Sequence, residues 1–239
     1  MKNIVIIPAR GGSKRLPNKN ILSLGGIPLI AHSILYAQNN SGIIDEIYVS
    51  TDDDKIAAVA LKYGAKVIDR PANLSGDYEP TVSALKHVLK SIETRVENVV
   101  LLQATNPLRP KNLLNEAFEI YEKGNYDSLF TVSRNHQKLG KIVENKFEPF
   151  NYRVGQRSQD LEPLFFENGL LYIAKANLIL PLNLASPERS RRARDDSKII
   201  SENAYPFEVN SIFANVDIDS QDDLDYAEYL YQKLITHNS

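Results

Sequence analysis

Short apolar runs alternate with helical patterns through the first half of the sequence, and this alternation restricts the possible folds more than any other feature. The apolar runs are rich in β-branched residues, as in strands that are buried on both faces of a parallel sheet. They lie at residues 4–7, 47–49, 66–68, 98–102 and 128–132. The helical patterns between them cover about 28–39, 55–63, 81–94 and 111–122. This order of strands and helices, with short links, predicts an α/β fold with a doubly wound, mostly parallel sheet.

The alternation stops after Ser133. Residues of about 134–167 are polar and aromatic without a clear period, and an apolar strand pattern returns at 170–174. A stretch of this length without regular structure inside a compact domain usually serves a function or forms a small appended unit. We therefore predict a single domain over residues 1–239, with an irregular insertion at about 134–167. A last helix is expected at about 221–234.

Composition excludes several classes of protein. The 28 Lys and Arg residues against 30 Asp and Glu give a net charge of −2, so no overall basic field favours nucleic acid or a membrane. The absence of cysteine excludes a disulfide framework, a Cys nucleophile and Cys-ligated metals, and the four histidines are too scattered for a typical zinc site. The first apolar run is too short for a signal peptide, and no later run approaches a membrane span. We therefore expect a soluble, cytoplasmic protein.

The loop that follows the first strand combines glycines with cations. It reads PARGGSKRLPNKN at residues 8–20 and contains Arg10, Lys14, Arg15 and Lys19. Ligands of parallel α/β sheets bind at the carboxyl ends of the strands, and close-set backbone amides with several cations suit a polyphosphate. The loop matches neither the Walker A sequence nor the dinucleotide fingerprint. A solvated basic turn is the alternative, but the position after the first strand favours a phosphate site.

Two aspartates near the end of the chain, Asp217 and Asp219, are spaced by two residues. In an extended segment they project to the same side, where paired carboxylates suit Mg²⁺ shared with substrate phosphates. The alternative is a helix-start signal, because Ser220 and Asp223 resemble a capping box. That alternative also accounts for Asp222, but it leaves the Asp217 and Asp219 pair unexplained.

The segment IPARGGSKRLPNKN at residues 7–20 resembles the signature of the acylneuraminate cytidylyltransferases, which activate nonulosonic acids with CTP. Other segments agree in order between Ile4 and about Tyr229. They are VSTDD at 49–53, RPA at 70–72, LLQATNPLR at 101–109, RSQDL at 157–161, ENG at 167–169 and DID at 217–219. The resemblance implies a Rossmann-type fold like that of nucleotide-diphospho-sugar transferases. It also implies transfer of CMP from CTP to the anomeric hydroxyl of a sialic-type acid, and a homodimer in which residues 134–167 serve dimerisation and sugar binding.

The resemblance assigns roles to individual residues. Catalytic roles are implied for Arg10, Lys19, Asp217 and Asp219, and the two aspartates would be the Mg²⁺ ligands. The implied nucleotide-binding residues are Ala9, Arg10, Gly11, Gly12, Ser13, Lys19, Asn20, Arg70 and Thr81. The implied sugar-binding residues are Gln103, Lys141, Arg157 and Gln159, since a sugar acid calls for a cation and neutral hydrogen-bonding groups. Ser158 replaces an arginine that the family often has, so the cation that binds the sugar carboxylate stays open, and ordinary surface charge explains Lys141 and Arg157 equally well.

Two other functions remain open. The chain could be a related nucleotidyltransferase for another sugar acid, such as a Kdo-type cytidylyltransferase, or for a sugar phosphate. It could also be a non-catalytic nucleotide- or sugar-binding protein on the same fold, although a pure binder has no need of the Asp217 and Asp219 pair. The arginine-rich run at 188–196 is flanked by acids and is expected to be a solvated loop.

Overall fold

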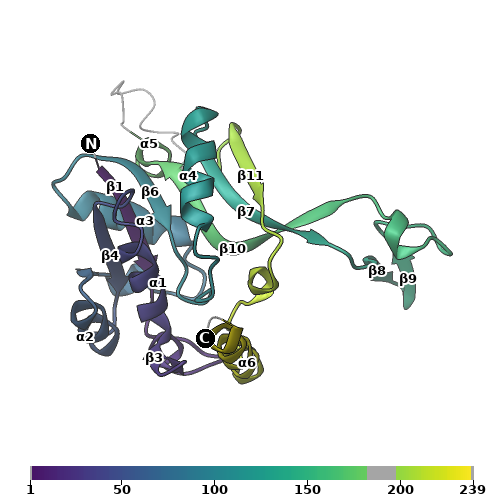
Figure 1. Ribbon diagram of the computed structural model, residues 1–239, viewed down its shortest axis with the longest axis horizontal. Coiled ribbons are helices and arrows are strands. Elements are labelled where there is room, and N and C mark those ends of the chain that lie inside the picture. Colours follow the sequence, from purple (N-terminus) through teal and green to yellow (C-terminus); the bar gives the residue numbers. More distant parts are fainter. Residues whose placement is uncertain (1, 182–197, 238–239) are drawn as a thin grey trace.

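A seven-stranded sheet forms the centre of the molecule (Figure 1), of which the computed structural model describes residues 2–181 and 198–237. The strand order is β11-β7-β10-β6-β1-β4-β5. The strands are β1 (Lys2–Pro8), β4 (Glu46–Thr51), β5 (Lys66–Asp69), β6 (Val96–Leu101), β7 (Ser128–Asn135), β10 (Leu164–Lys175) and β11 (Ala204–Glu208). Neighbouring strands pair in parallel except at β10, which runs antiparallel to both β6 and β7. The predicted doubly wound, mostly parallel sheet is confirmed.

Helices cover both faces of this sheet. They are α1 (Leu29–Gln38), α2 (Asp54–Lys62), α3 (Thr81–Ser91), α4 (Leu113–Lys123) and α5 (Ala176–Ile179). A further helix, α6 (Gln221–His237), packs in an apolar cluster away from the sheet. Buried side chains of α1, α2 and α4 share one apolar cluster, and those of α3 and α5 share a second cluster on the other face. None of the helices in the described ranges combines the length and apolar character needed to span a lipid bilayer.

The alternation of side chains along β1 shows why the strand pattern is continuously apolar. Val5 and Ile7 pack in the α1 cluster, whereas Ile4 and Ile6 pack in the α3 cluster, and all four are fully buried. A strand with both faces covered has no polar side, so its sequence shows no period of two. Burying four such side chains contributes roughly 2 kcal/mol each to folding. This core fixes the carboxyl ends of the central strands, from which the site loops leave.

Part of the segment expected to be irregular, at about 134–167, forms strands. β7 and β10 continue to pair beyond the body of the sheet, with Leu164 opposite Asn135, and a hairpin of β8 (Gly140–Val143) and β9 (Lys146–Pro149) follows. A short 3₁₀ turn, η3 (Ser158–Asp160), completes this arm, which projects from the body in Figure 1. The segment was missed because its strands are exposed on both faces and carry no apolar alternation. Its turn also uses Glu144 and Asn145 at positive φ in place of glycine.

Several further elements were not expected. The edge strand β11 contains Pro206, which an edge position tolerates because no partner needs its missing N–H. A small hairpin of β2 (Ser23–Leu24) and β3 (Ile27–Pro28) lies between the first loop and α1. Short 3₁₀ turns occur at η1 (Lys19–Ile21), η2 (Ala72–Leu74) and η4 (Ile212–Asn215). The loop expected at 188–196 lies outside the described residues.

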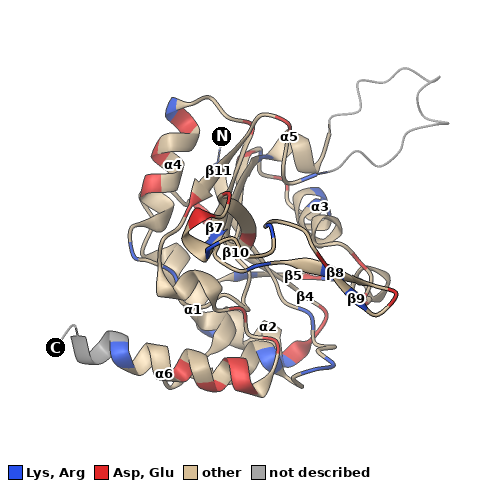
Figure 2. Ribbon diagram, turned by 90° about the vertical axis from the view of Figure 1, so that its right-hand side faces the viewer, with Lys and Arg blue, Asp and Glu red and all other residues tan. Residues whose placement is uncertain are grey.

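The carboxyl-terminal helix α6 docks against the β2–β3 hairpin. The backbone N–H of Gly25 donates to Glu228 (2.7 Å), and the Tyr231 ring lies only 1.9 Å from where a Cβ on Gly25 would be. Gly25 also has a φ of +58°, so glycine suits this close approach on both counts. Figure 2 shows acidic residues on the first turns of α6 and a basic residue further along, as the helix dipole favours. This docking brings the segment before α6 next to the first loop.

Glu46 joins three parallel strands at their amino ends. Its carboxylate accepts hydrogen bonds from Lys2 (2.7 Å), Tyr48 and Lys66 (3.0 Å), which belong to β1, β4 and β5. The Lys2 ammonium above all, and then the Tyr48 hydroxyl, lower the pKa of Glu46 to about 2. Ionised Glu46 therefore stabilises the folded state above the ordinary pKa of Glu, and this contribution is lost as the pH falls toward 2.

Glu46→Gln should lower the free energy of unfolding by about 1 kcal/mol at pH 7, after allowance for solvent screening. The difference from the wild type should shrink as the pH falls from about 4.5 toward 2, because wild-type Glu46 is then protonated as well. Denaturant unfolding at a series of pH values measures this. Glu97→Gln, at an exposed position of β6, serves as the control and should leave the unfolding curve unchanged. A deficit of the Glu46 variant that stays constant down to pH 2 would contradict the assignment.

Candidate active site

A cavity of about 240 Å³ lies at the carboxyl ends of β1 and β6 and beside the loop after β5. Most of the residues expected to bind the nucleotide line this cavity. They are Ala9, Arg10, Ser13, Lys19, Asn20, Arg70 and Thr81. Gly11 and Gly12 are not among the lining residues, and the Gly11 N–H donates to the Asp52 carboxylate (2.9 Å). Thr81 is the first residue of α3, so the amino end of this helix also borders the cavity.

A larger hollow of about 720 Å³ opens at the opposite ends of the same strands, around Asn3, Val96 and Lys175. Neither the cationic loop nor the aspartate pair lines it. Ligands of parallel α/β sheets bind at the carboxyl ends of the strands, which is the side of the smaller cavity. The smaller cavity is therefore the candidate site, since it combines this position with concentrated charge.

Backbone and side-chain hydrogen bonds fold the first loop back on itself. Asn18 adopts a left-handed conformation (φ 57°), and the turn η1 follows directly. The buried side chain of Asn20 donates to the carbonyl of Arg10 (2.9 Å), which ties the two ends of the loop together. This closure leaves the Lys19 side chain only 12% exposed, close to the cavity. Asn20 thus shapes the loop in addition to bordering the site.

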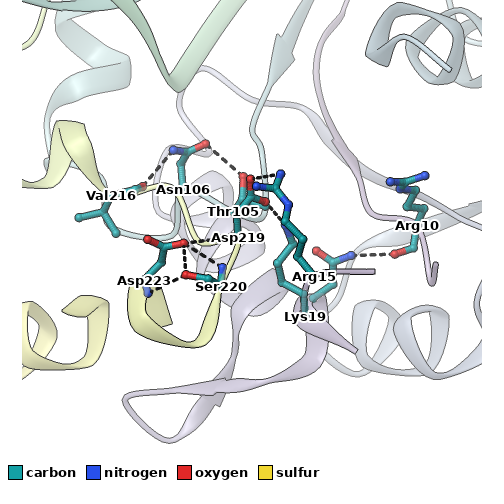
Figure 3. A network of polar contacts seen from close by, with 10 residues as sticks. Arg10, Arg15, Lys19, Thr105, Asn106, Val216, Asp219, Ser220 and Asp223 are labelled. Carbon is teal, nitrogen blue, oxygen red and sulfur yellow. Dashed lines mark hydrogen bonds and ion pairs between the residues drawn. The ribbon is translucent and has the colours of Figure 1, made fainter. Parts of the chain in front are cut away.

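The first loop and the late aspartates lie next to each other. Asp219 forms ion pairs with Arg15 (2.6 Å) and with Lys19 (2.6 Å), as Figure 3 shows. The carboxylate bridges two cations of the loop, one exposed and one nearly buried. The first loop and Asp219 are therefore in direct contact, although neither Asp217 nor Asp219 is among the residues that line the cavity.

The other two cations of the loop pair with a different carboxylate. Asp77 accepts from Arg10 (2.8 Å) and from Lys14, and these hydrogen bonds, that of Lys14 first, hold its pKa below the ordinary value. Asp77 lines the cavity, on the segment between η2 and α3. All four cations of the first loop thus have a carboxylate partner, and the two carboxylates come from different segments, one before α3 and one before α6.

Asp217 and Asp219 flank Ile218, whose side chain is fully buried and whose N–H donates to the carbonyl of Thr105 (2.9 Å). Asp217 is exposed on one side, yet the protein atoms around it remove enough water to raise the pKa of its carboxyl. The charge of Asp219 raises that pKa further, while a hydrogen bond with Thr105 opposes the rise. Two neighbouring carboxylates, one of them poorly solvated, fit a hard divalent cation that supplies the missing counter-charge. In the described part of the chain, no third acidic or histidine side chain is placed to share such an ion.

The residues expected to bind the sugar fall into two groups. Gln103 lines the cavity, directly after β6. Lys141, Arg157 and Gln159 all lie on the arm, away from the cavity lining, and Arg157 is paired with Asp160 (2.7 and 3.0 Å). Within one chain the structure therefore does not bring these three residues to Gln103.

Several residues of the site were not identified from the sequence. Asp77 follows a short turn whose sequence gives no sign of an ion pair with the first loop. Thr105 and Asn106 follow β6 closely, so the rule that ligands bind at the carboxyl ends of strands could have pointed to them. Arg70 was expected at the nucleotide and does line the cavity, but its guanidinium donates to the backbone and hydroxyl oxygens of Ser50. Burial lowers the pKa of the Arg70 guanidinium and favours a structural role, in which Arg70 holds the wall of the cavity in place.

A family model described as cytidylyltransferase matches residues 4–239. The chain belongs to the cytidylyltransferase family. It is similar to the pseudaminic acid cytidylyltransferase of Campylobacter jejuni subsp. jejuni serotype O:23/36 (strain 81-176), with 36% identity over 100% of this chain and 99% of the relative. It is also similar to the CMP-N,N'-diacetyllegionaminic acid synthase of Legionella pneumophila subsp. pneumophila (strain Philadelphia 1), with 34% identity over 97% of each chain.

Among solved structures, a CMP:2-keto-3-deoxy-manno-octonic acid synthetase complexed with CTP has a TM-score of 0.70 to this chain. The identity is 20%, and the match covers 98% of this chain and 99% of the other, so it supports the fold. The predicted family, fold and enzyme class are confirmed: this cytidylyltransferase is a nucleotidyltransferase. The alternative of a non-catalytic binding protein is thereby set aside.

Proposed function

We propose that this cytidylyltransferase transfers CMP from CTP to the anomeric hydroxyl of a nonulosonic acid, giving a CMP-sugar and pyrophosphate. The observation that carries the proposal is the contact of Asp219 with Arg15 and Lys19 of the cationic loop, of which Lys19 lines the cavity. Two relatives that match almost the full chain are named for pseudaminic acid and N,N'-diacetyllegionaminic acid. A reaction that uses CTP also favours the cytoplasm as its location.

Asp217 and Asp219 would hold Mg²⁺ in this reaction. When bound, Mg²⁺ neutralises phosphate charge and lowers the pKa of the attacking hydroxyl. Phosphoryl transfer depends chiefly on positioning and on neutralising charge, and the chain's own residues serve both purposes. Arg10 and Lys19 would hold the triphosphate, with the amino end of α3 beside it. Gln103 would donate and accept hydrogen bonds with hydroxyls of the sugar acid.

A substrate panel tests the proposal. The purified protein is incubated with CTP, Mg²⁺ and one sugar acid at a time: pseudaminic acid, N,N'-diacetyllegionaminic acid, N-acetylneuraminic acid or Kdo. Release of pyrophosphate is followed, and the products are identified by mass spectrometry. At least one of the nine-carbon acids should give a CMP-sugar. Product from Kdo alone would favour the Kdo-type alternative, and release of pyrophosphate with none of the acids would contradict the proposal.

In the same assay, Asp219→Asn should reduce pyrophosphate release about a hundredfold or more, because a neutral amide weakens both the metal site and the partner of Lys19. Asp222→Asn removes the same charge from the first turn of α6 and should retain the wild-type rate. Turnover close to the wild type by Asp219→Asn would count against the catalytic assignment.

We propose that Asp77 is a stand-in anion for the loop cations when no triphosphate is bound. Arg10 and Lys14 share the Asp77 carboxylate, although the loop that carries them suits phosphate. Binding of CTP would have to exchange these ion pairs for contacts to phosphate oxygens. Exposed ion pairs are individually weak, so the exchange is readily reversible.

Asp77→Asn should therefore strengthen CTP binding by about twofold to fivefold at low ionic strength, because Arg10 and Lys14 are released for phosphate. Isothermal titration calorimetry measures this, and the gain should diminish as salt is added. Asp69→Asn, which removes a charge at the exposed end of β5, is the matched control and should change affinity less. Equal gains from the two variants would mean that only the overall field had changed.

We further propose a homodimer formed through the arm. Large apolar side chains are exposed along it, including Ile142 (79%), Phe147 (55%), Phe150 (68%) and Val154 (86%). A hollow of about 450 Å³ lined by Phe130, Val132 and Phe165 lies at its base. Large apolar side chains that are exposed together on one arm favour an interface. An arm that reaches a partner would also explain why three of the expected sugar-binding residues lie far from Gln103.

Ile142→Lys combined with Phe147→Lys should shift the protein from dimer to monomer in sedimentation velocity at micromolar concentration. The two residues face each other across β8 and β9, so both charges fall on one patch. Leu61→Lys alters a side chain on α2 that is 61% exposed, and this variant should remain dimeric. A wild-type protein that sediments as a monomer would refute the proposal.

A further inference from the structure

Asn106 joins two distant segments of the chain to the loop after β6. Its side chain is 1% exposed, and its amide donates to the carbonyl of Val216 (3.0 Å) and to that of Asn168 (3.3 Å). Figure 3 shows the amide directed at Val216, close to Thr105 and Asp219. A buried amide with two carbonyl acceptors would leave both unsatisfied if it were lost, at a cost of about 1–3 kcal/mol for each buried group.

The segment that Asn106 holds carries the candidate metal ligands. Residues 216–219 belong to no strand or helix, so no ladder of backbone hydrogen bonds fixes them. Burial of Val216 and Ile218 holds them in the α6 cluster. Two hydrogen bonds add to this: the Asn106 amide donates to the carbonyl before Asp217, and the Thr105 carbonyl accepts from the N–H after it. Asp217 is thus held between two hydrogen bonds to consecutive residues of one loop.

The other acceptor of Asn106 lies beside Gln103. Gly169 has a φ of +75°, and a Cβ on it would lie 2.8 Å from Oδ1 of Asn106 and 3.3 Å from Nε2 of Gln103. Both amides therefore pack against the same glycine of β10. Asn106 therefore packs against the same glycine as Gln103, the residue proposed to bind the sugar, and it also contacts the segment that carries the two aspartates.

We propose that Asn106 is a positioning residue that sets the place of Asp217 relative to Gln103. It touches neither substrate nor metal and acts through the carbonyl of Val216. The inference rests on the proposed function, because it takes Asp217 as a ligand of the divalent cation. Loss of the amide should loosen the aspartate segment and weaken metal binding, while the first loop, which Asn106 does not contact, keeps its affinity for phosphate.

Asn106→Leu tests this, with Asn98→Leu as the matched control. Asn98 is also a buried asparagine, at the opposite end of β6, and it bonds to Asn3 (2.9 Å) and Tyr121 (2.7 Å) away from the cavity. Both variants lose a buried polar network and should show similar falls in melting temperature. Only Asn106→Leu should raise the Mg²⁺ concentration for half-maximal pyrophosphate release, by about tenfold.

Calorimetric titration with CTP gives a readout that needs no turnover. In EDTA, Asn106→Leu should bind CTP within about twofold of the wild type. With Mg²⁺ present, the gain in CTP affinity seen for the wild type should be largely lost. An unchanged Mg²⁺ requirement would overturn the inference, as would an equal rise in both variants or an equal loss of CTP affinity in EDTA.

Asn106→Ser provides a second variant should the leucine variant not fold. The serine hydroxyl retains one donor, so its Mg²⁺ requirement should lie between those of the wild type and the leucine variant, and a wild-type value would overturn the inference. If wild-type protein gives no product with any acid, the proposed function fails. The calorimetric comparison with and without Mg²⁺ still decides the role of Asn106 in that case.

Discussion

The ion pairs of Asp219 with Lys19 and Arg15 join segments that are 200 and 204 residues apart in the sequence. A loop with four cations repels itself, and so do two neighbouring aspartates, unless each set neutralises the other. The fold brings the two sets of charges together. β1 leads into the cationic loop, and α6, which follows the aspartates, docks on the hairpin after this loop. Arg10 and Lys14 form the same kind of ion pairs with Asp77, which lines the cavity. Each cation of the first loop thus has a carboxylate partner before any substrate enters, and the four cations outnumber their two partners.

Apolar packing, and not the ion pairs, determines where these charges lie. Leu16 of the first loop, Leu108 of the loop after β6, and Val216 and Ile218 beside the aspartates share one buried cluster with α6. Burial of a side chain of this size contributes about 1.5–3 kcal/mol, whereas an exposed ion pair contributes about 0–1 kcal/mol. Each charged segment is therefore held by a hydrophobic residue of its own. The cations remain free to change partners without disturbing the fold.

Much of the fold could be predicted because the central strands are buried on both faces. Runs such as Ile4–Ile7 have no other common explanation, and the loop after them stands where α/β proteins bind ligands. The arm could not be predicted, because its strands are polar or exposed and gain their pairing from backbone hydrogen bonds that leave no apolar pattern. The roles of Asn106 and Asp77 could not be predicted for another reason. Their roles arise from contacts with residues far along the chain, which a single sequence does not display.

The reversed direction of β10 has a topological consequence. Parallel neighbours require a crossover that returns the chain from the carboxyl end of one strand to the amino end of the next, but an antiparallel neighbour allows the chain to turn back at the end where β7 stops. The candidate site lies at this end of the sheet, so residues inserted between β7 and β10 extend outward and leave the register of the sheet unchanged. Lengthening such a loop carries only a small entropic cost, about 0.6 kcal/mol for each doubling. The reach of the arm can therefore change over evolution while the loops of the candidate site stay in place.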